Sequence, residues 1–260
     1  CTHVLVEGVT MENSPMWQVV PYYSDDVTIR NVRILAPARS PNTDAIDPFS
    51  SSHVLIEHVY ADTGDDNVAI KSGEPGSAGP DSPSRDITIR DCTFMHGHGI
   101  SVGSELSGGA ENILAEHITF DGTDNGIRVK ANRDRGHPVT HLVFRDIQMK
   151  DVKNAIVISE YYPRMMPSVG GVPPAPVTRL TPHFHNFLIE NVTATGSTNA
   201  GVIVGLPEAP VTDVVLRNVN LSARKGLTIG YADVTGQNVV VHAAEGQPIT
   251  KLAGANVSLK

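Results

Sequence analysis

The sequence has few of the residues that, by their number alone, place a protein in a functional class. Its 260 residues include two cysteines, Cys1 and Cys92. Two cysteines make neither a disulfide framework nor a CxxC metal site. Cys92 lies in an apolar stretch, which indicates a buried core thiol. No run of about 18 apolar residues is present, so a transmembrane helix is excluded.

Positive charge is also scarce. The chain has 20 Lys and Arg against 28 Asp and Glu, for a formal net charge of −8. This balance argues against a general nucleic-acid-binding protein. Any site for an acidic polymer must therefore be basic locally. No secretion signal is visible and the chain begins at Cys1 rather than Met, so we expect a truncated product that lacks N-terminal coils and a cap.

What the sequence does contain is a repeat. Hexamers with apolar residues at positions 1, 3 and 6 begin every 23 to 45 residues, and this alternation indicates half-buried strands. The nine hexamers are 4-VLVEGV, 27-VTIRNV, 54-VLIEHV, 87-ITIRDC, 113-ILAEHI, 142-LVFRDI, 187-FLIENV, 214-VVLRNV and 239-VVVHAA.

The fifth position of the hexamer holds residues that tolerate a positive φ angle. A column of Gly, Asn, Asp and His predicts the same tight bend in every repeat. Only Ala243, in the last hexamer, departs from the pattern. The residues of the column are Gly8, Asn31, His58, Asp91, His117, Asp146, Asn191 and Asn218.

Each repeat carries a further short strand after the bend. Units of roughly 25 residues cannot close a core alone and must stack on their neighbours. The pattern predicts an all-β fold, a parallel β-helix in which residues 1–260 form a single domain; a propeller would need longer units and antiparallel hairpins. The further strands are 45-AIDPF, 67-NVAIKSG, 99-GISVGSE, 126-GIRVKAN, 155-AIVISEY, 201-GVIVGL and 226-GLTIGYA.

Two long gaps interrupt the repeat. Residues 73–84 are rich in Gly, Pro and Ser, and residues 163–182 are rich in Pro. Both segments are predicted to be loops that leave the coil. Long loops on a rigid scaffold often line binding sites, although a tolerated surface insertion is an equal alternative.

Aligning the further strands brings chemically active residues together. Asp44, Asp66, His98 and Asn125 fall level in successive coils, about 4.8 Å apart, and Asp65 precedes the column by one residue. Three carboxylates at this spacing repel one another, so at least one pKa should be raised. One carboxyl could then act as an acid and another as a base, as glycosidic bond cleavage requires.

Basic residues share the same wall. Arg128 and Lys130 lie two apart on a strand and therefore point to one face, and Lys71 falls level with Lys130. These cations suit a carboxylate on the substrate.

Each feature also has a plainer interpretation. Asp44 could form a turn, His98 could be a bend residue, and Arg128 and Lys130 could be a solvated face. Asp65 and Asp66 could bind Ca²⁺. Together these interpretations are weaker, because they would have to coincide in successive coils.

Four ordered blocks, 42-NTDAID, 64-GDDNVAIKSG, 97-GHGISVGSE and 127-IRVKAN, resemble the signature of the polygalacturonases, the pectin-cleaving glycoside hydrolases of family 28. The resemblance covers residues 1 to about 235. It implies a right-handed parallel β-helix that hydrolyses α-1,4-galacturonan with inversion. The chain departs from the usual pattern at Ala45 and Asn67.

The resemblance also implies roles for individual residues. Asp65 would be the general acid, Asp66 and Asp44 would hold and activate water, and His98 would support the acid and contact substrate. The residues expected to bind substrate are Arg128, Lys130, Tyr161, Asn42 and Lys71.

Other functions stay open. A relative that cleaves rhamnogalacturonan, a calcium-dependent pectate lyase, and a non-catalytic carbohydrate-binding β-helix fragment are the alternatives. For the hydrolase we expect no metal or other cofactor, a pectic polysaccharide as the partner and a monomer. We expect no nucleic acid or membrane partner, and a secreted or periplasmic location that follows from the polymeric substrate.

Overall fold

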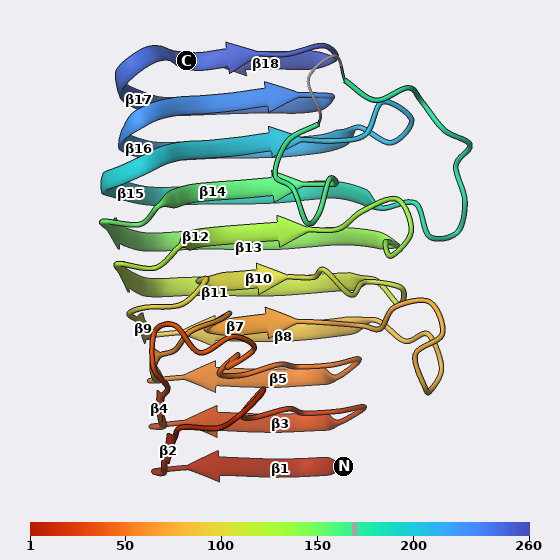
Figure 1. The fold of residues 1–260 in the computed structure, drawn as a ribbon, viewed down its shortest axis with the longest axis vertical. Helices are drawn as coiled ribbons and strands as arrows, with labels where there is room; N and C mark the ends of the chain where they lie inside the picture. The colour runs from red at the N-terminus through yellow and green to blue at the C-terminus, as the bar shows by residue number, and fades with distance from the viewer. Residues whose placement is uncertain (168–170) are drawn as a thin grey trace.

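The computed structural model describes residues 1–167 and 171–260. In these ranges the chain forms eighteen strands and no helix, so none could span a membrane. The strands wind into coils that stack along one axis, from the N-terminus at one end to the C-terminus at the other (Figure 1). The ladders between these strands are parallel. The parallel β-helix predicted from the repeats is thereby confirmed.

The strands fall into three stacks. The first contains β1 (Thr2–Glu7), β3 (Asp25–Arg30), β5 (Ser52–Glu57), β8 (Ser84–Arg90), the starts of β11 (Ala110–Asp121), β13 (Pro138–Lys150), β15 (His183–Val204), β16 (Val211–Gly230) and β17 (Ala232–Lys251), and β18 (Ala255–Leu259). The second contains β2 (Thr10–Glu12), β4 (Arg33–Leu35), β6 (Tyr60–Asp62), β9 (Thr93–Phe94) and later parts of the long strands. The third contains β7 (Val68–Ile70), β10 (Ile100–Val102), β12 (Asn125–Lys130), β14 (Asn154–Ser159) and the ends of β15, β16 and β17.

Two details of the predicted strands differ. Residues 45–49 form only isolated bridges, at Ile46 and Phe49, rather than a strand. In the last coils the expected separate strands merge, and β15 runs continuously for 22 residues. Backbone pairing on both sides carries the ladder through the bends in that part of the stack.

The bend column is confirmed, because all eight of its members have positive φ, between 52° and 67°. The last hexamer, however, was assigned the wrong register. Val239 pairs with Val219, so 239-VVVHAA belongs to the second stack, and 234-VTGQNV is the true equivalent of 214-VVLRNV. Its fifth residue is Asn238, with φ of 55°, which removes the apparent exception at Ala243.

A second column of positive φ, not predicted from the sequence, precedes the first eight hexamers by one residue. Each of these eight hexamers therefore has one left-handed residue just before it and another at its fifth position, five residues further on. The second column holds His3, Asp26, His53, Asp86, Asn112, His141, Asn186 and Asp213.

The core fills the space between the three stacks. Side chains alternate along each strand, so that in β3 the residues Val27 and Ile29 are buried while Thr28 is half-exposed. Equivalent core residues stack between coils, as the rings of Phe94 and Phe120 do at 5.6 Å. Burial of these apolar columns is the main force that holds successive coils together.

The two predicted loops leave the same side of the stack, where third-stack strands end (Figure 1). Residues 168–170 of the second loop lie outside the described ranges. Arg179 of that loop forms an ion pair with Asp81 of the first at 2.7 Å. The two excursions therefore contact each other across several coils.

Candidate active site

The strand register places the predicted site residues level with one another. Ile46, Val68, Ile100 and Ile127 pair in succession through the third stack. The predicted column stands two residues before each of them, which confirms the alignment. The column is Asp44, Asp66, His98 and Asn125.

Asp66 is the buried centre of the site, with 1% of its surface exposed. Its carboxylate accepts hydrogen bonds from Lys130 Nζ at 2.8 Å, Ser101 Oγ at 2.7 Å and Arg128 Nη1 at 3.5 Å. Burial by itself would raise the pKa of Asp66, but Lys130 and Arg128 outweigh it and the pKa is lowered. Asp66 is therefore an ionised carboxylate that holds the two cations on one wall.

Asp65 forms a pair with His98. The distance from Asp65 Oδ1 to His98 Nδ1 is 3.0 Å. The backbone N–H groups of Asn42 and Asp66 also donate to this carboxylate, at 3.1 and 2.8 Å. Burial opposes ionisation of Asp65, but the bonds from His98 and the backbone win, so its pKa is lowered. The hydrogen bond to Asp65 raises the pKa of His98, and one proton is thus held on the imidazole side of the pair.

Asp44 is also buried, and it belongs to a second charged cluster. Lys71 Nζ lies 3.3 Å from Asp44, 3.7 Å from Asp47 and 3.6 Å from Glu105. Its ammonium group also lies 4.5 Å from the centre of the Trp17 ring. Burial, and then repulsion from the other carboxylates of the site, raise the pKa of Asp44 to about 6.

The raised pKa that carboxylate crowding predicts is thus found on Asp44 and not on Asp65. Burial also raises the pKa of Asp47 well above its usual range. The site therefore separates its carboxyls into ionised ones, Asp65 and Asp66, and ones that hold protons more readily, Asp44 and Asp47.

Lys71 lies among carboxylates of the protein itself. Only 4% of its surface is exposed, and its ammonium group faces three carboxylates of the protein. Lys130 is almost as buried and faces Asp66, so burial alone does not exclude contact between Lys71 and substrate, and that role stays a prediction. The strand position of Lys71 is level with Lys130, as predicted, but its side chain turns toward Asp44.

Tyr161 and Tyr162 have different surroundings. The Tyr161 hydroxyl donates to the carbonyl of Gly205 at 3.0 Å, away from the charged groups. The ring of Tyr162, by contrast, lies 5.4 Å from Lys130 Nζ. Tyr162 is therefore the tyrosine whose ring lies beside Lys130, and contact between Tyr161 and substrate stays a prediction.

Ligand atoms of Asp65, Asp66 and His98 lie within 4.8 Å of one another, as they do in many metal sites. The donor set fits a metal poorly, because Lys130 and Arg128 already neutralise Asp66. A divalent ion would compete with two fixed cations at this carboxylate.

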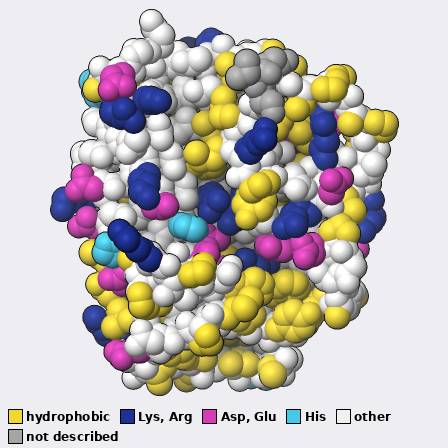
Figure 2. Space-filling model, in the orientation of Figure 1, with side chains coloured by type: hydrophobic (Ala, Val, Ile, Leu, Met, Phe, Trp, Pro, Cys, Tyr) yellow, Lys and Arg dark blue, Asp and Glu magenta, His cyan; other side chains and the backbone are white. Residues whose placement is uncertain are grey.

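Seen from outside, acidic, basic and histidine side chains meet near the middle of the face that carries the third stack (Figure 2). This mixture is typical of a site that binds a polar ligand and moves protons.

A sequence profile of the family described as Glycosyl hydrolases family 28 matches residues 1–243. The chain belongs to this family. The assignment agrees with the parallel β-helix and with the residues gathered on its third stack.

Relatives of this family 28 chain include a probable polygalacturonase of Vitis vinifera, 33% identical over 231 residues. That alignment covers 84% of this chain and 44% of the relative. An endo-polygalacturonase of Pectobacterium carotovorum subsp. carotovorum is 37% identical over 155 residues, covering 60% of this chain and 37% of the relative.

Solved structures are similar as well. An exopolygalacturonase from Thermotoga maritima superposes with a TM-score of 0.83 at 31% identity, covering 95% of this chain and 54% of that one. A polygalacturonase from Erwinia carotovora ssp. carotovora gives 0.75 at 30% identity, with 88% and 56% covered. The chain spans about half the length of these relatives.

The sequence did not predict several residues of this candidate site: Ser101, Asp47, Glu105 and Tyr162. Ser101 is directly paired with Arg128, so an alignment of the third-stack strands could have found it. Asp47 follows Asp44 by three residues, but nothing in the sequence indicates that its side chain is completely buried beside Lys71.

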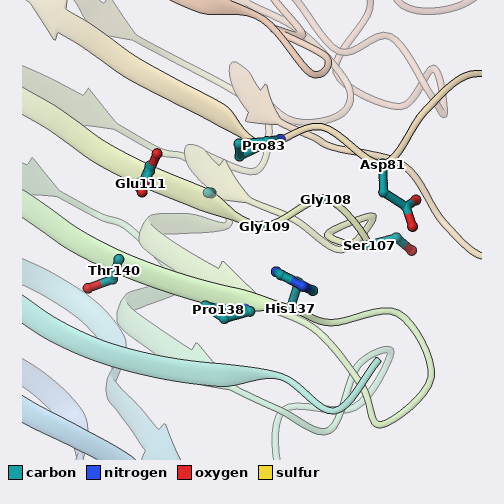
Figure 3. A pocket seen from close by; sticks show the side chains of 10 residues that line it. Asp81, Pro83, Ser107, Gly108, Gly109, Glu111, His137, Pro138 and Thr140 are labelled. Atoms are coloured by element: carbon teal, nitrogen blue, oxygen red, sulfur yellow. The ribbon is translucent and has the colours of Figure 1, made fainter. Parts of the chain in front are cut away.

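A separate hollow of about 300 Å³ lies beside the two long loops, outside the charged cluster. Figure 3 shows Asp81 and Ser107 at one end of it, His137 in the middle, and Glu111 and Thr140 at the other. Burial and the nearby Arg179 lower the pKa of His137. None of the predicted site residues lines this hollow.

Proposed function

We propose that this chain carries the acid–base site of a hydrolase that cleaves α-1,4-galacturonosyl linkages in pectin or polygalacturonate with inversion. One observation carries the proposal: carboxyls with opposite pKa shifts share a wall with Arg128 and Lys130. Carboxyls pushed apart in pKa can divide acid and base work, and fixed cations suit a uronate. The names of the relatives support this substrate.

Asp44 suits the role of base. A carboxylate with a pKa near 6 is a better proton acceptor than an ordinary one and is still ionised at neutral pH. We infer that Asp44 takes a proton from the attacking water. Asp66 stays ionised and orients the cations.

Asp65 suits the role of acid only together with His98. The free Asp65 carboxylate is ionised, and the proton of the pair rests on the imidazole. We infer that this proton passes from His98 Nδ1 to Asp65 and from there to the leaving glycosidic oxygen, which leaves His98 neutral. The cleaved bond keeps its electron pair on the oxygen that receives the proton.

The remaining roles follow from position. Arg128, Lys130 and Tyr162 would contact the sugar and its carboxylate, and Asn42 would act through the backbone N–H that it donates to Asp65. We infer a secreted or periplasmic enzyme, because the substrate is an extracellular polymer. We also infer that residues 1–260 form one domain and that the enzyme is a monomer.

The assignment of the acid is tested by Asp65→Asn. General acid catalysis contributes about 10²–10⁴-fold, so hydrolysis of polygalacturonate should fall by that factor while binding of the polymer persists. Asp121→Asn, at an exposed carboxylate paired with Lys150, is the matched control and should keep full activity.

An aryl oligogalacturonide with a good leaving group separates acid from base. This substrate needs little protonation, so Asp65→Asn should lose far less activity on it than on polygalacturonate, whereas Asp44→Asn should lose activity on both. The reverse pattern would make Asp44 the acid.

The anomeric form of the first product, followed by proton NMR, should be β, and an α product would contradict inversion.

A further inference from the structure

A groove of about 410 Å³ runs past His98, along the turns that precede the third-stack strands. Its lining residues come from five successive coils, between Arg39 and Lys153. Four strand spacings of about 4.8 Å make it roughly 19 Å long, parallel to the stack. An extended polymer that reaches the Asp65–His98 pair would have this groove beside it.

Three basic side chains of the groove already have carboxylate partners. Lys153 contacts Asp124 at 2.5 Å, and His98 contacts Asp65 at 3.0 Å. The third, His96, has its Nδ1 atom 2.9 Å from Asp62 Oδ1.

Arg39 is different. It is exposed at the edge of the groove, and across residues 1–167 and 171–260 the structure gives its guanidinium no hydrogen-bond or ion-pair partner. The groove beside the Asp65–His98 pair thus carries a permanently charged group, the Arg39 guanidinium, that no carboxylate of the described residues neutralises.

The turn that carries Arg39 is held in place. Ser40 N–H donates to the Pro37 carbonyl at 2.9 Å, and the Thr43 hydroxyl donates to the Ser40 carbonyl at 2.8 Å. Gly64 N–H donates in turn to Thr43 Oγ1 at 3.0 Å. A Cβ on Gly64 would lie 2.2 Å from the Ser40 carbonyl oxygen, so only glycine allows this close approach. The turn that carries Arg39 therefore packs directly against Gly64, the residue that precedes Asp65.

We propose that Arg39 binds a free uronate carboxylate of the substrate in this groove and so selects against methyl-esterified units at that position. This inference rests on the proposed function. The guanidinium fork matches a carboxylate with two parallel hydrogen bonds. A methyl ester has no charge and offers no such pair of equivalent acceptors. Arg39 acts in addition to Arg128 and Lys130, which face Asp66 on the strands themselves.

The test compares Arg39→Ala with the unaltered chain on polygalacturonate and on highly methyl-esterified pectin. On polygalacturonate the KM should rise about three- to tenfold, the effect of a partly exposed charged pair, with kcat within about twofold. On esterified pectin the two proteins should have the same KM. Added salt should raise the KM of the unaltered chain more steeply than that of Arg39→Ala.

Two variants control for a general loss of charge or fold. Arg39→Lys keeps the charge without the fork and should give an intermediate KM. Arg224→Ala removes an exposed arginine, 3.6 Å from Glu245 on the last coils, and should leave both substrates unchanged. All variants should unfold at the same temperature.

An unchanged KM on polygalacturonate, or an equal loss on both substrates, would overturn the carboxylate site. Calorimetric binding of a galacturonate oligomer separates this result from failure of the proposed function. If the unaltered chain binds the oligomer but releases no reducing ends, hydrolysis is contradicted. The Arg39 proposal then stands if Arg39→Ala weakens that binding and falls if it does not.

Discussion

The charge of each carboxyl in this site is decided by its immediate neighbours. Asp65 and Asp66 follow each other in the chain, yet one faces an imidazole and the other faces Lys130 and Arg128. Asp44 is buried like Asp66, but the cation beside it, Lys71, is shared with Asp47 and Glu105. Burial therefore dominates at Asp44 and raises its pKa, whereas partners dominate at the adjacent pair.

These shifts predict the pH dependence of kcat/KM. As the base, Asp44 must be ionised, so activity should rise with pH through about 6. The proton held by His98 is lost above its raised pKa, which lies above the ordinary value of about 6.5, so activity should fall there. Lys71→Met removes a positive charge that lowers the pKa of Asp44. In this variant the rise of activity on the acid side of the pH profile (the acid limb) should shift to higher pH, while the fall on the basic side (the basic limb) should stay at the same pH.

Lys71→Arg, which keeps the charge, is the control and should restore the acid limb. A purely structural role for Lys71 would lower activity equally at every pH. An acid limb that stays in place in Lys71→Met would mean that Asp44 is not the base.

Much of the site could be predicted from the residues alone, for a physical reason. Strand register is periodic, so Asp44, Asp66 and His98 could be aligned without coordinates. Strand periodicity gives the face from which a side chain leaves, but it gives neither the rotamer nor the partners of that side chain, and burial is set by neighbouring coils. For that reason neither the orientation of Lys71 nor the position of the Tyr162 ring beside Lys130 could be predicted.

At the scale of the strand, the fold depends on left-handed residues, which stand near both ends of the first eight hexamers. A residue with a Cβ in that conformation costs about 1–2 kcal/mol, and β-branched residues are least suited to it. Asn, Asp, His and Gly occupy the first column because they tolerate positive φ best. Their side chains add bonds between coils, such as Asn191 to Asp146 at 2.8 Å.

His58 allows this requirement to be tested, because it is exposed and has φ of 52°. His58→Gly should leave the free energy of unfolding unchanged or slightly higher, and His58→Val should lower it by about 1–2 kcal/mol. Urea denaturation measures both. Thr28→Val, at an ordinary strand position, should change stability by less than about 0.5 kcal/mol. Equal stability of the two His58 variants would show that the bend is not required.

The strand pattern was predicted well except in the last coil. There, the apolar run 239-VVVHAA was a stronger match to the hexamer than 234-VTGQNV, in which Gly236 replaces the usual apolar residue. Alternation marks a strand but does not say to which stack it belongs. The asparagine at the fifth position of 234-VTGQNV, Asn238, is the sequence feature that marks the right segment, and its φ is positive.

At the scale of the whole molecule, the third stack presents one continuous wall. Asp44, Asp66, His98 and Arg128 come from four successive coils. No single coil could supply acid, base and cations, so the site exists only because the coils stack in register. The chain carries this assembly although it spans about half the length of its relatives.

The central claim is that this wall hydrolyses galacturonan without a metal. The most direct test is the release of reducing ends from polygalacturonate in EDTA, with viscosity followed alongside. We predict release that EDTA does not diminish and that Asp65→Asn abolishes. Activity that EDTA removes, or products with the ultraviolet absorbance of an unsaturated uronide, would contradict the claim, and so would no release at all.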